Sequence, residues 1–79
     1  MTNPSFNILI VEDELLIAEL LKELLQDLNN TVVGIVKTYD AAVEVLRKKP
    51  EIDLVMLDIN LNDHKNGIDL ARYIEAQHA

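Results

Sequence analysis

This 79-residue chain contains three runs of mainly apolar residues in which polar and apolar residues do not alternate. They occupy residues 6–11, 31–36 and 52–57 and are rich in isoleucine, leucine and valine. A continuous run of this length is typical of a parallel strand covered on both faces, whereas a strand with one face in water alternates polar and apolar residues. The runs therefore predict a parallel sheet with helices packed against both faces.

The segments between the runs carry apolar residues at the helical period of about 3.6 residues. The first predicted helix covers residues 14–28 and ends at the turn formers Asn29 and Asn30. One face of it carries Ile17, Leu20, Leu21, Leu24 and Leu28. Its apolar arc, which extends round to Ala18, spans roughly 160°, wider than the stripe of a helix that lies on one sheet. Something besides the sheet is therefore expected to cover this helix.

Two more helices are predicted further along the chain. Thr38 is expected to cap the second helix, and Pro50 is expected to stop it. The inward residues of the second helix would be Ala42, Val43 and Leu46. Gly67 is expected to open the third helix, which carries Ile68, Ala71 and Ile74 at helical spacing.

Strands and helices thus alternate along the whole chain. With right-handed crossovers, this order gives an α/β fold in which a doubly wound parallel sheet has helices on both faces. The sheet would hold three strands in the order 2-1-3, accompanied by three helices. A chain of this length forms at most one small domain, which we expect to cover residues 1–79.

The charge of the chain argues against several kinds of partner. Its formal net charge is −7, and its basic residues are few and dispersed. Nucleic acids and anionic membranes are bound by clustered Lys and Arg, so neither is expected to bind this segment. The one basic cluster, residues 47–49, falls in the last turn of the second predicted helix, where cations complement the helix dipole.

Other features of the sequence bear on its compartment. No apolar stretch approaches the roughly 20 residues of a membrane-spanning helix, and the N-terminus lacks the basic and apolar regions of a secretion signal. The chain has no cysteine, which leaves neither a disulfide framework nor a thiolate metal site. These features predict a soluble protein of the cytoplasm.

Carboxylates directly follow two of the apolar runs. Glu12 and Asp13 come after the first run, and Asp58 comes after the third. Because the carboxyl ends of parallel strands gather at one edge of a sheet, these side chains are expected to lie close together. Mg²⁺ prefers oxygen ligands and keeps several waters, so carboxylates from two strands could share it. The sequence therefore predicts a magnesium site at this edge.

Each of these acids also has a purely structural interpretation. Glu12 and Asp13 could complement the dipole of the helix that follows them, and an isolated aspartate such as Asp58 after a strand is often a turn former. The occurrence of all three acids at strand ends favours the metal site. His64 and His78 lie in polar or terminal contexts without a second imidazole at ligand spacing, so neither is expected to bind a metal.

Three segments of the chain are distinctive when taken together: residues 8–14 (ILIVEDE), 54–61 (LVMLDINL) and 66–71 (NGIDLA). In this order and spacing, they resemble the receiver domain of bacterial two-component response regulators. The resemblance extends from Asn7 to about Gln77 and implies a flavodoxin-like fold. In the commonest family pattern the glycine corresponding to Gly67 comes one position earlier; the arrangement here is similar to a loop variant often joined to DNA-binding output domains.

The resemblance implies a role for each residue that matches the family pattern. Asp58 would accept a phosphoryl group from a histidine kinase or a phosphotransfer protein, and the chain would not itself be an enzyme. Glu12, Asp13 and Asp58 would hold Mg²⁺, with the backbone carbonyl of Asn60 as a further ligand. The alternative for Asn60 is that it is simply a polar loop residue.

The resemblance is also incomplete. A complete receiver has a fourth and a fifth strand, which bring a Ser or Thr, an aromatic switch residue and a Lys. None of these can be assigned here, because Lys65 lies in the loop after Asp58 and Lys37 follows the second apolar run. The resemblance therefore implies a partial receiver, truncated to three strands, in which phosphorylation is slowed by the loss of transition-state stabilisation.

Two other functions stay open on the sequence alone. An apolar strand at the edge of a sheet recruits another strand, so the chain could be a structural fragment that self-associates through residues 52–57 and its first helix, or that pairs with the missing half of the domain. On this ground we expect an oligomer rather than a monomer. A metal-dependent phosphohydrolase is less favoured, because the common Asp-x-Asp nucleophile motif is replaced by Asp58-Ile59-Asn60.

Overall fold

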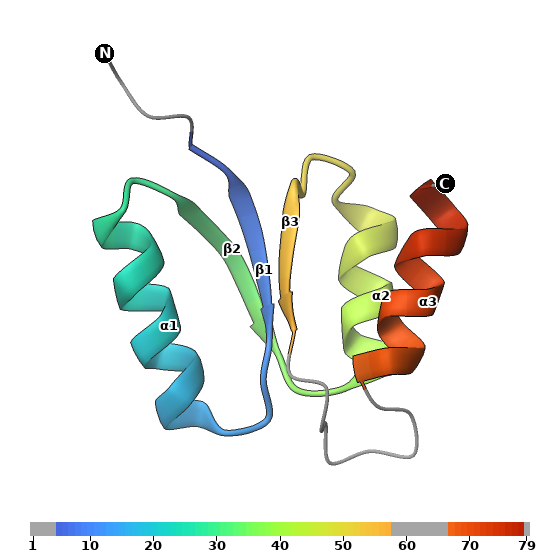
Figure 1. Cartoon of the computed structure of the whole chain (residues 1–79), viewed down its shortest axis with the longest axis horizontal. Coiled ribbons are helices and arrows are strands. Elements are labelled where there is room, and N and C mark those ends of the chain that lie inside the picture. The colour runs from blue at the N-terminus through green and yellow to red at the C-terminus, as the bar shows by residue number, and fades with distance from the viewer. Residues whose placement is uncertain (1–4, 58–66, 79) are drawn as a thin grey trace.

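The computed structural model describes residues 5–57 and 67–78. In this part of the chain three strands alternate with three helices (Figure 1). The elements are β1 (Asn7–Val11), α1 (Leu15–Asp27), β2 (Thr31–Val36), α2 (Tyr39–Lys48), β3 (Leu54–Leu57) and α3 (Gly67–His78). The strands are parallel and follow the order β2-β1-β3, which confirms the predicted doubly wound α/β sheet.

β1 is the central strand, and its register determines which residues meet at each edge of the sheet. Its last residue, Val11, pairs with Val36 of β2 on one side and with Leu57 of β3 on the other. The pairing with β2 shifts between Ile8 and Leu9. All three strands end in step, so their last residues lie at the same edge of the sheet.

Helices cover both faces of the sheet, with α1 on one face and α2 and α3 together on the other (Figure 1). Successive residues of a strand point to opposite faces, so β1 contributes to both layers. Leu9 and Val11 pack in the layer of α2 and α3, while Ile8 and Ile10 pack in the layer of α1. All four side chains are buried, as expected for a continuous apolar run.

Two strands are shorter than the apolar runs that predicted them. β1 begins at Asn7 rather than at residue 6, and β3 begins at Leu54 rather than at residue 52. The backbone N–H of Asp53 donates to the carbonyl of Asn7 at 2.8 Å, and Asp53 Oδ2 accepts a hydrogen bond from the Asn7 N–H at 2.8 Å. Asp53 therefore binds the start of β1 partly through its side chain. The predicted bounds of β2 are confirmed.

The sheet covers only part of the apolar face that was predicted for α1. Ala18 is buried there, with Leu21 and Leu25 packed around it. Leu20, Leu24 and Leu28, which belong to the predicted apolar face, are exposed. The apolar residues of α1 cover much of its circumference, so the helical period alone could not determine which of them meet the sheet. The expectation that the sheet would leave part of this apolar arc uncovered is confirmed.

The inner face of α3 is rotated relative to the prediction. Leu70 is fully buried, and Tyr73 and Ile74 pack beside it, whereas Ile68 and Ala71 are exposed. The ring of Tyr73 meets that of Tyr39 on α2 edge to face, with 6.3 Å between the ring centroids. The contact between α2 and α3 explains the rotation, because α3 packs against a helix as well as a strand. Within the described ranges, no helix is both long and apolar enough to cross a lipid bilayer.

Thr38 caps α2, as the sequence predicted. Its Oγ1 accepts a hydrogen bond from the N–H of Ala41 at 3.1 Å. We expect Thr38→Ala to lower the free energy of unfolding by about 1 kcal/mol, because a backbone N–H in the first turn loses its partner. Urea unfolding followed by circular dichroism measures this change. Thr38→Ser keeps the hydroxyl and should stay close to the unmodified chain, and equal losses in both variants would assign the effect to the methyl group instead.

Candidate functional site

The carboxyl edge of the sheet carries two of the predicted acidic residues, Glu12 and Asp13. Glu12 directly follows Val11 of β1, and its backbone N–H donates to the carbonyl of Val36 at 2.9 Å, which extends the contact with β2. Leu57, the last residue of β3, pairs with Val11, and Asp58 is the next residue in the chain. In the sequence, Glu12 therefore directly follows one member of the Val11–Leu57 pair, and Asp58 directly follows the other.

Glu12 is the one charged residue that is buried in the described part of the chain, with only 8% of its surface exposed. Its Oε2 accepts a hydrogen bond from the backbone N–H of Glu14 at 3.1 Å. Glu14 precedes α1 but makes no side-chain cap of its own, so Glu12 places a carboxylate near the positive end of the helix dipole. The structural interpretation of Glu12 is therefore correct in part. A carboxylate has a second oxygen, so this contact is compatible with a metal ligand.

Asp13 lies beside Glu12 and is half-buried. Together these two residues place two carboxylates at the end of the central strand, one shielded from solvent and one accessible. Oxygen donors of this kind fit Mg²⁺, which is commonly held in proteins by one or two carboxylates while it keeps several waters. The pair alone would give an incomplete ligand set, so the site depends on further donors.

The remaining predicted ligands lie outside the described residues. Asp58, the expected phosphoacceptor, and Asn60, the expected carbonyl ligand, both fall within residues 58–66. His64 lies there too. Over residues 5–57 and 67–78, no group of three or more acidic, histidine or cysteine side chains comes together as a metal site. The ligand set of Glu12, Asp13, Asp58 and Asn60 therefore stays a prediction.

A hollow of about 310 Å³ lies beside Glu12, on the face of the sheet that α1 covers. It is lined by Val11, Glu12, Glu14, Ile17, Leu21, Met56 and Leu57. Sequence reasoning placed Ile17 and Leu21 in an apolar face without linking them to the acidic pair. Their position could have been inferred, because Ile17 and Leu21 are one helical turn apart at the start of the helix that Glu12 precedes.

Comparison with known families identifies the chain. A model of the response regulator receiver domain matches residues 8–79, which include both acid-bearing segments. The chain belongs to the response regulator receiver domain family. Receiver domains of this family serve two-component signalling, so the predicted resemblance is confirmed.

Several relatives of this receiver domain are regulators named PhyR. The phyllosphere-induced regulator PhyR of Methylorubrum extorquens is 39% identical over 62 residues, which are 78% of this chain and 23% of that protein. The solution structure of the PhyR receiver domain from Erythrobacter litoralis has a TM-score of 0.83 and 38% identity, and the match covers 92% of this chain and 56% of that one. The chain thus spans only part of each relative.

A third relative has been solved together with a partner. The anti-anti-sigma factor PhyR of Bartonella quintana, in complex with the anti-sigma factor NepR, matches this chain with a TM-score of 0.84 and 34% identity. The match covers 92% of this chain and 30% of that one. At this identity and coverage, the solved relatives support the same fold over 92% of this chain.

Proposed function

We propose that this receiver domain accepts a phosphoryl group on Asp58 from a histidine kinase or a phosphotransfer protein. The observation that supports the proposal best is the register of the sheet within a chain of the receiver family. Val11 pairs with Leu57, and in the sequence Glu12 and Asp13 directly follow Val11 while Asp58 directly follows Leu57. A phosphoacceptor on one strand would then adjoin the acids on the next.

The chemistry assigns a different task to each residue. A carboxylate oxygen of Asp58 attacks the phosphorus atom, a new oxygen–phosphorus bond forms, and the bond from phosphorus to the donor atom breaks with its electron pair left on the donor. Glu12 and Asp13 would hold Mg²⁺ with Asp58, and the backbone carbonyl of Asn60 would complete the protein ligands. When bound, the cation offsets the negative charge of the transferring oxygens.

Several finer parts of the proposal rest on the sequence. We propose that the chain is a phosphoacceptor rather than an enzyme, and that it works in the cytoplasm without binding nucleic acid or membrane through this segment. A phosphohydrolase remains less favoured for the lack of an Asp-x-Asp motif. In the family, a Ser or Thr and a Lys stabilise the transition state of phosphoryl transfer. We propose that phosphorylation is slower if no other residues take their place.

Magnesium dependence tests the proposal. Incubation with Mg²⁺ and acetyl phosphate should add one phosphoryl group to the chain, which intact-mass spectrometry detects. Chelation of the metal should abolish the adduct, because the attack of one anion on another loses its charge compensation. Asp13→Asn should require more Mg²⁺ for the same yield, whereas Asp40→Asn, on the exposed surface of α2, should not. An adduct that forms equally well without metal would contradict the proposed site.

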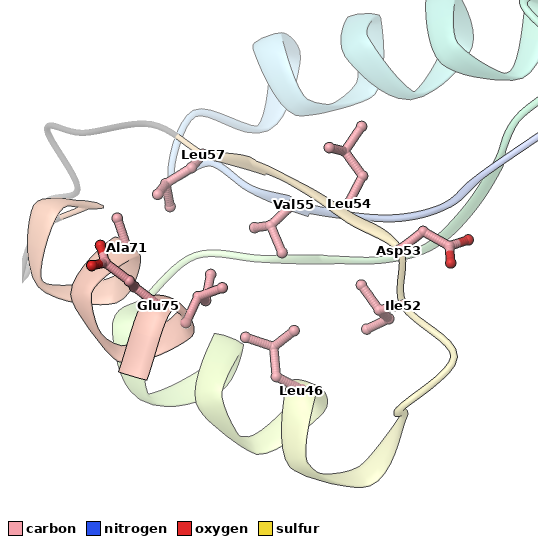
Figure 2. A pocket seen from close by; sticks show the side chains of 9 residues that line it. Leu46, Ile52, Asp53, Leu54, Val55, Leu57, Ala71 and Glu75 are labelled. Carbon is pink, nitrogen blue, oxygen red and sulfur yellow. The ribbon is translucent and has the colours of Figure 1, made fainter. Parts of the chain in front are cut away.

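A structural role through β3 is the second candidate, and a specific observation favours it. β3 is an edge strand within the described sheet, and Leu54 is 44% exposed. A hollow of about 560 Å³ runs along this edge beneath α2 and α3 (Figure 2). Val55 and Leu57 turn toward these helices, whereas Leu54 turns toward the opposite face (Figure 2). Such an edge recruits a further strand, from a second copy or from another part of a receiver domain.

Size measurement across a dilution series tests association through this edge. If β3 pairs between copies, light scattering coupled to gel filtration should give an oligomer that dissociates on dilution. Leu54→Lys should weaken the oligomer, because the side chain of Leu54 is 44% exposed and a charge on an edge strand opposes pairing. A compact monomer at every concentration would contradict association through β3. It would not affect the phosphoacceptor proposal, because that proposal is tested by the mass of the phosphoryl adduct.

A further inference from the structure

Lys37 lies at the same edge of the sheet as the acidic pair. It directly follows Val36, the last residue of β2, and Val36 pairs with Val11 at the end of β1. The backbone N–H of Glu12 donates to the carbonyl of Val36 at 2.9 Å, so the contact between these two segments continues past the end of β1. One strand end therefore leads to Glu12 and Asp13, and the neighbouring strand end leads to a lysine.

The backbone at Lys37 is held on both sides. Only Lys37 and Thr38 separate β2 from α2, and this connection leaves the sheet at the same end as the connection from β1 to α1 (Figure 1). The carbonyl before Lys37 accepts the hydrogen bond from Glu12, and the Thr38 hydroxyl after it caps α2. A long loop would let a lysine move away from the edge, whereas this short connection keeps the base of the side chain there.

No described carboxylate lies within ion-pair distance of Lys37. Its side chain is exposed, and the one ion pair among residues 5–57 and 67–78 joins Glu44 to Lys48 on α2. The other described basic residues lie within α1 or α3 or at the far end of α2: Lys22, Arg47, Lys48, Lys49 and Arg72. In the described part of the chain, Lys37 is thus the one positive side chain that directly follows a strand.

We propose that Lys37 is a specificity-determining residue of the phosphoacceptor site, and that it attracts the phosphoryl oxygens of an anionic phosphodonor. This inference rests on the proposed function. The transferring group brings negative charge to an edge that already carries acids, so a positive charge beside them favours its approach. A lysine ammonium is a compact charge on a flexible stem and a common partner of phosphate.

The position of Lys37 separates this role from that of the lysine in complete receivers. That lysine belongs to a fifth strand, whereas Lys37 follows β2, on the opposite side of β1 from β3. β2 and β3 are two strand spacings apart, about 10 Å. An exposed charge acting over this range is screened by water and salt, so its effect should be a few fold rather than many orders of magnitude.

The same charge acts in the opposite direction on a divalent cation. Lys37 repels Mg²⁺ at Glu12 and Asp13, so it should weaken metal binding while it favours the donor. Removal of the charge should therefore tighten Mg²⁺ binding and slow phosphorylation. Damage to the edge of the sheet would instead weaken both, which separates an electrostatic role of Lys37 from a merely structural one.

Lys37→Gln tests the proposal with two phosphodonors. At saturating Mg²⁺ the variant should form the phosphoryl adduct about fivefold more slowly with acetyl phosphate, which is a dianion near neutral pH. With phosphoramidate, whose protonated nitrogen lowers its negative charge, the rate should fall less than about twofold. Lys37→Arg keeps the charge and should restore the rate. A titration with Mg²⁺ alone, followed by amide chemical shifts, should show about twofold tighter binding to Lys37→Gln.

Lys49→Gln is the matched control, because it removes the same charge at the opposite end of α2. It should leave the rates and the Mg²⁺ affinity unchanged. The inference is overturned if Lys49→Gln slows the reaction as much as Lys37→Gln, if Lys37→Gln keeps the rate with acetyl phosphate, or if its Mg²⁺ binding weakens. In each of these cases the unmodified chain still forms an adduct. An unmodified chain without any adduct would refute the proposed function and this inference together.

Discussion

Asp58→Asn is expected to abolish the phosphoryl adduct completely while it leaves the fold unchanged. The amide has nearly the same size and shape as the carboxylate, but it is a much weaker nucleophile and cannot form a stable acyl phosphate. The loss should therefore be total rather than partial. Intact-mass spectrometry after incubation with Mg²⁺ and acetyl phosphate measures it, and circular dichroism verifies that the variant still folds.

Asp53→Asn is the matched control, because Asp53 precedes β3 just as Asp58 follows it. Asp53 Oδ2 accepts a hydrogen bond from the N–H of Asn7, and an asparagine oxygen can accept the same bond. This variant should keep the adduct. Retention of the adduct in Asp58→Asn, or its loss in Asp53→Asn, would move the phosphoacceptor away from Asp58 and refute the proposed function.

Leu9→Ala is expected to lower the free energy of unfolding by about 2–5 kcal/mol. Leu9 is fully buried in the layer between β1 and the helices α2 and α3, where its removal leaves a cavity. Small domains bury a modest fraction of their surface and are marginally stable, so a loss of this size could unfold most of the population at 25 °C. Urea unfolding followed by circular dichroism measures the effect.

Leu16→Ala provides the comparison for the same chemical change on the surface. Leu16 is 86% exposed, so truncation of its side chain leaves no cavity and should change the free energy of unfolding by less than about 0.5 kcal/mol. The contrast between the two leucines tests whether the layers of the fold are correctly placed. Similar losses at both positions would imply that Leu16 is covered in solution, for example by a second copy.

Much of the fold could be predicted because strand burial and helix caps leave strong local signals. The continuous run that became β1 predicted burial on both faces, and Thr38 and Gly67 predicted where α2 and α3 begin. The inner faces of α1 and α3 could not be predicted equally well. Leucines surround α1, so its rotation depends on the shape of the sheet, and α3 is oriented by its contact with α2.

The candidate site was predictable only in outline. The positions of Glu12 and Asp13 followed from the end of an apolar run, and their place at the carboxyl edge of β1 is confirmed. The near-complete burial of Glu12 and its hydrogen bond to Glu14 were not predicted, because they depend on how the loop folds back before α1. The roles of Asp58 and Asn60 come from the receiver family and remain predictions.

The hydrogen bond from the Glu14 N–H to Glu12 makes the first turn of α1 sensitive to what happens at the acidic pair. Any cation that recruits Oε2 must share this oxygen with the amide or displace it. A cation held through Oε2, rather than through the other oxygen of Glu12, would therefore couple occupancy of the site to the local opening of the helix N-terminus. In that case we expect the hydrogen-exchange rate of the Glu14 amide to rise on ion binding, which can be followed without any added label.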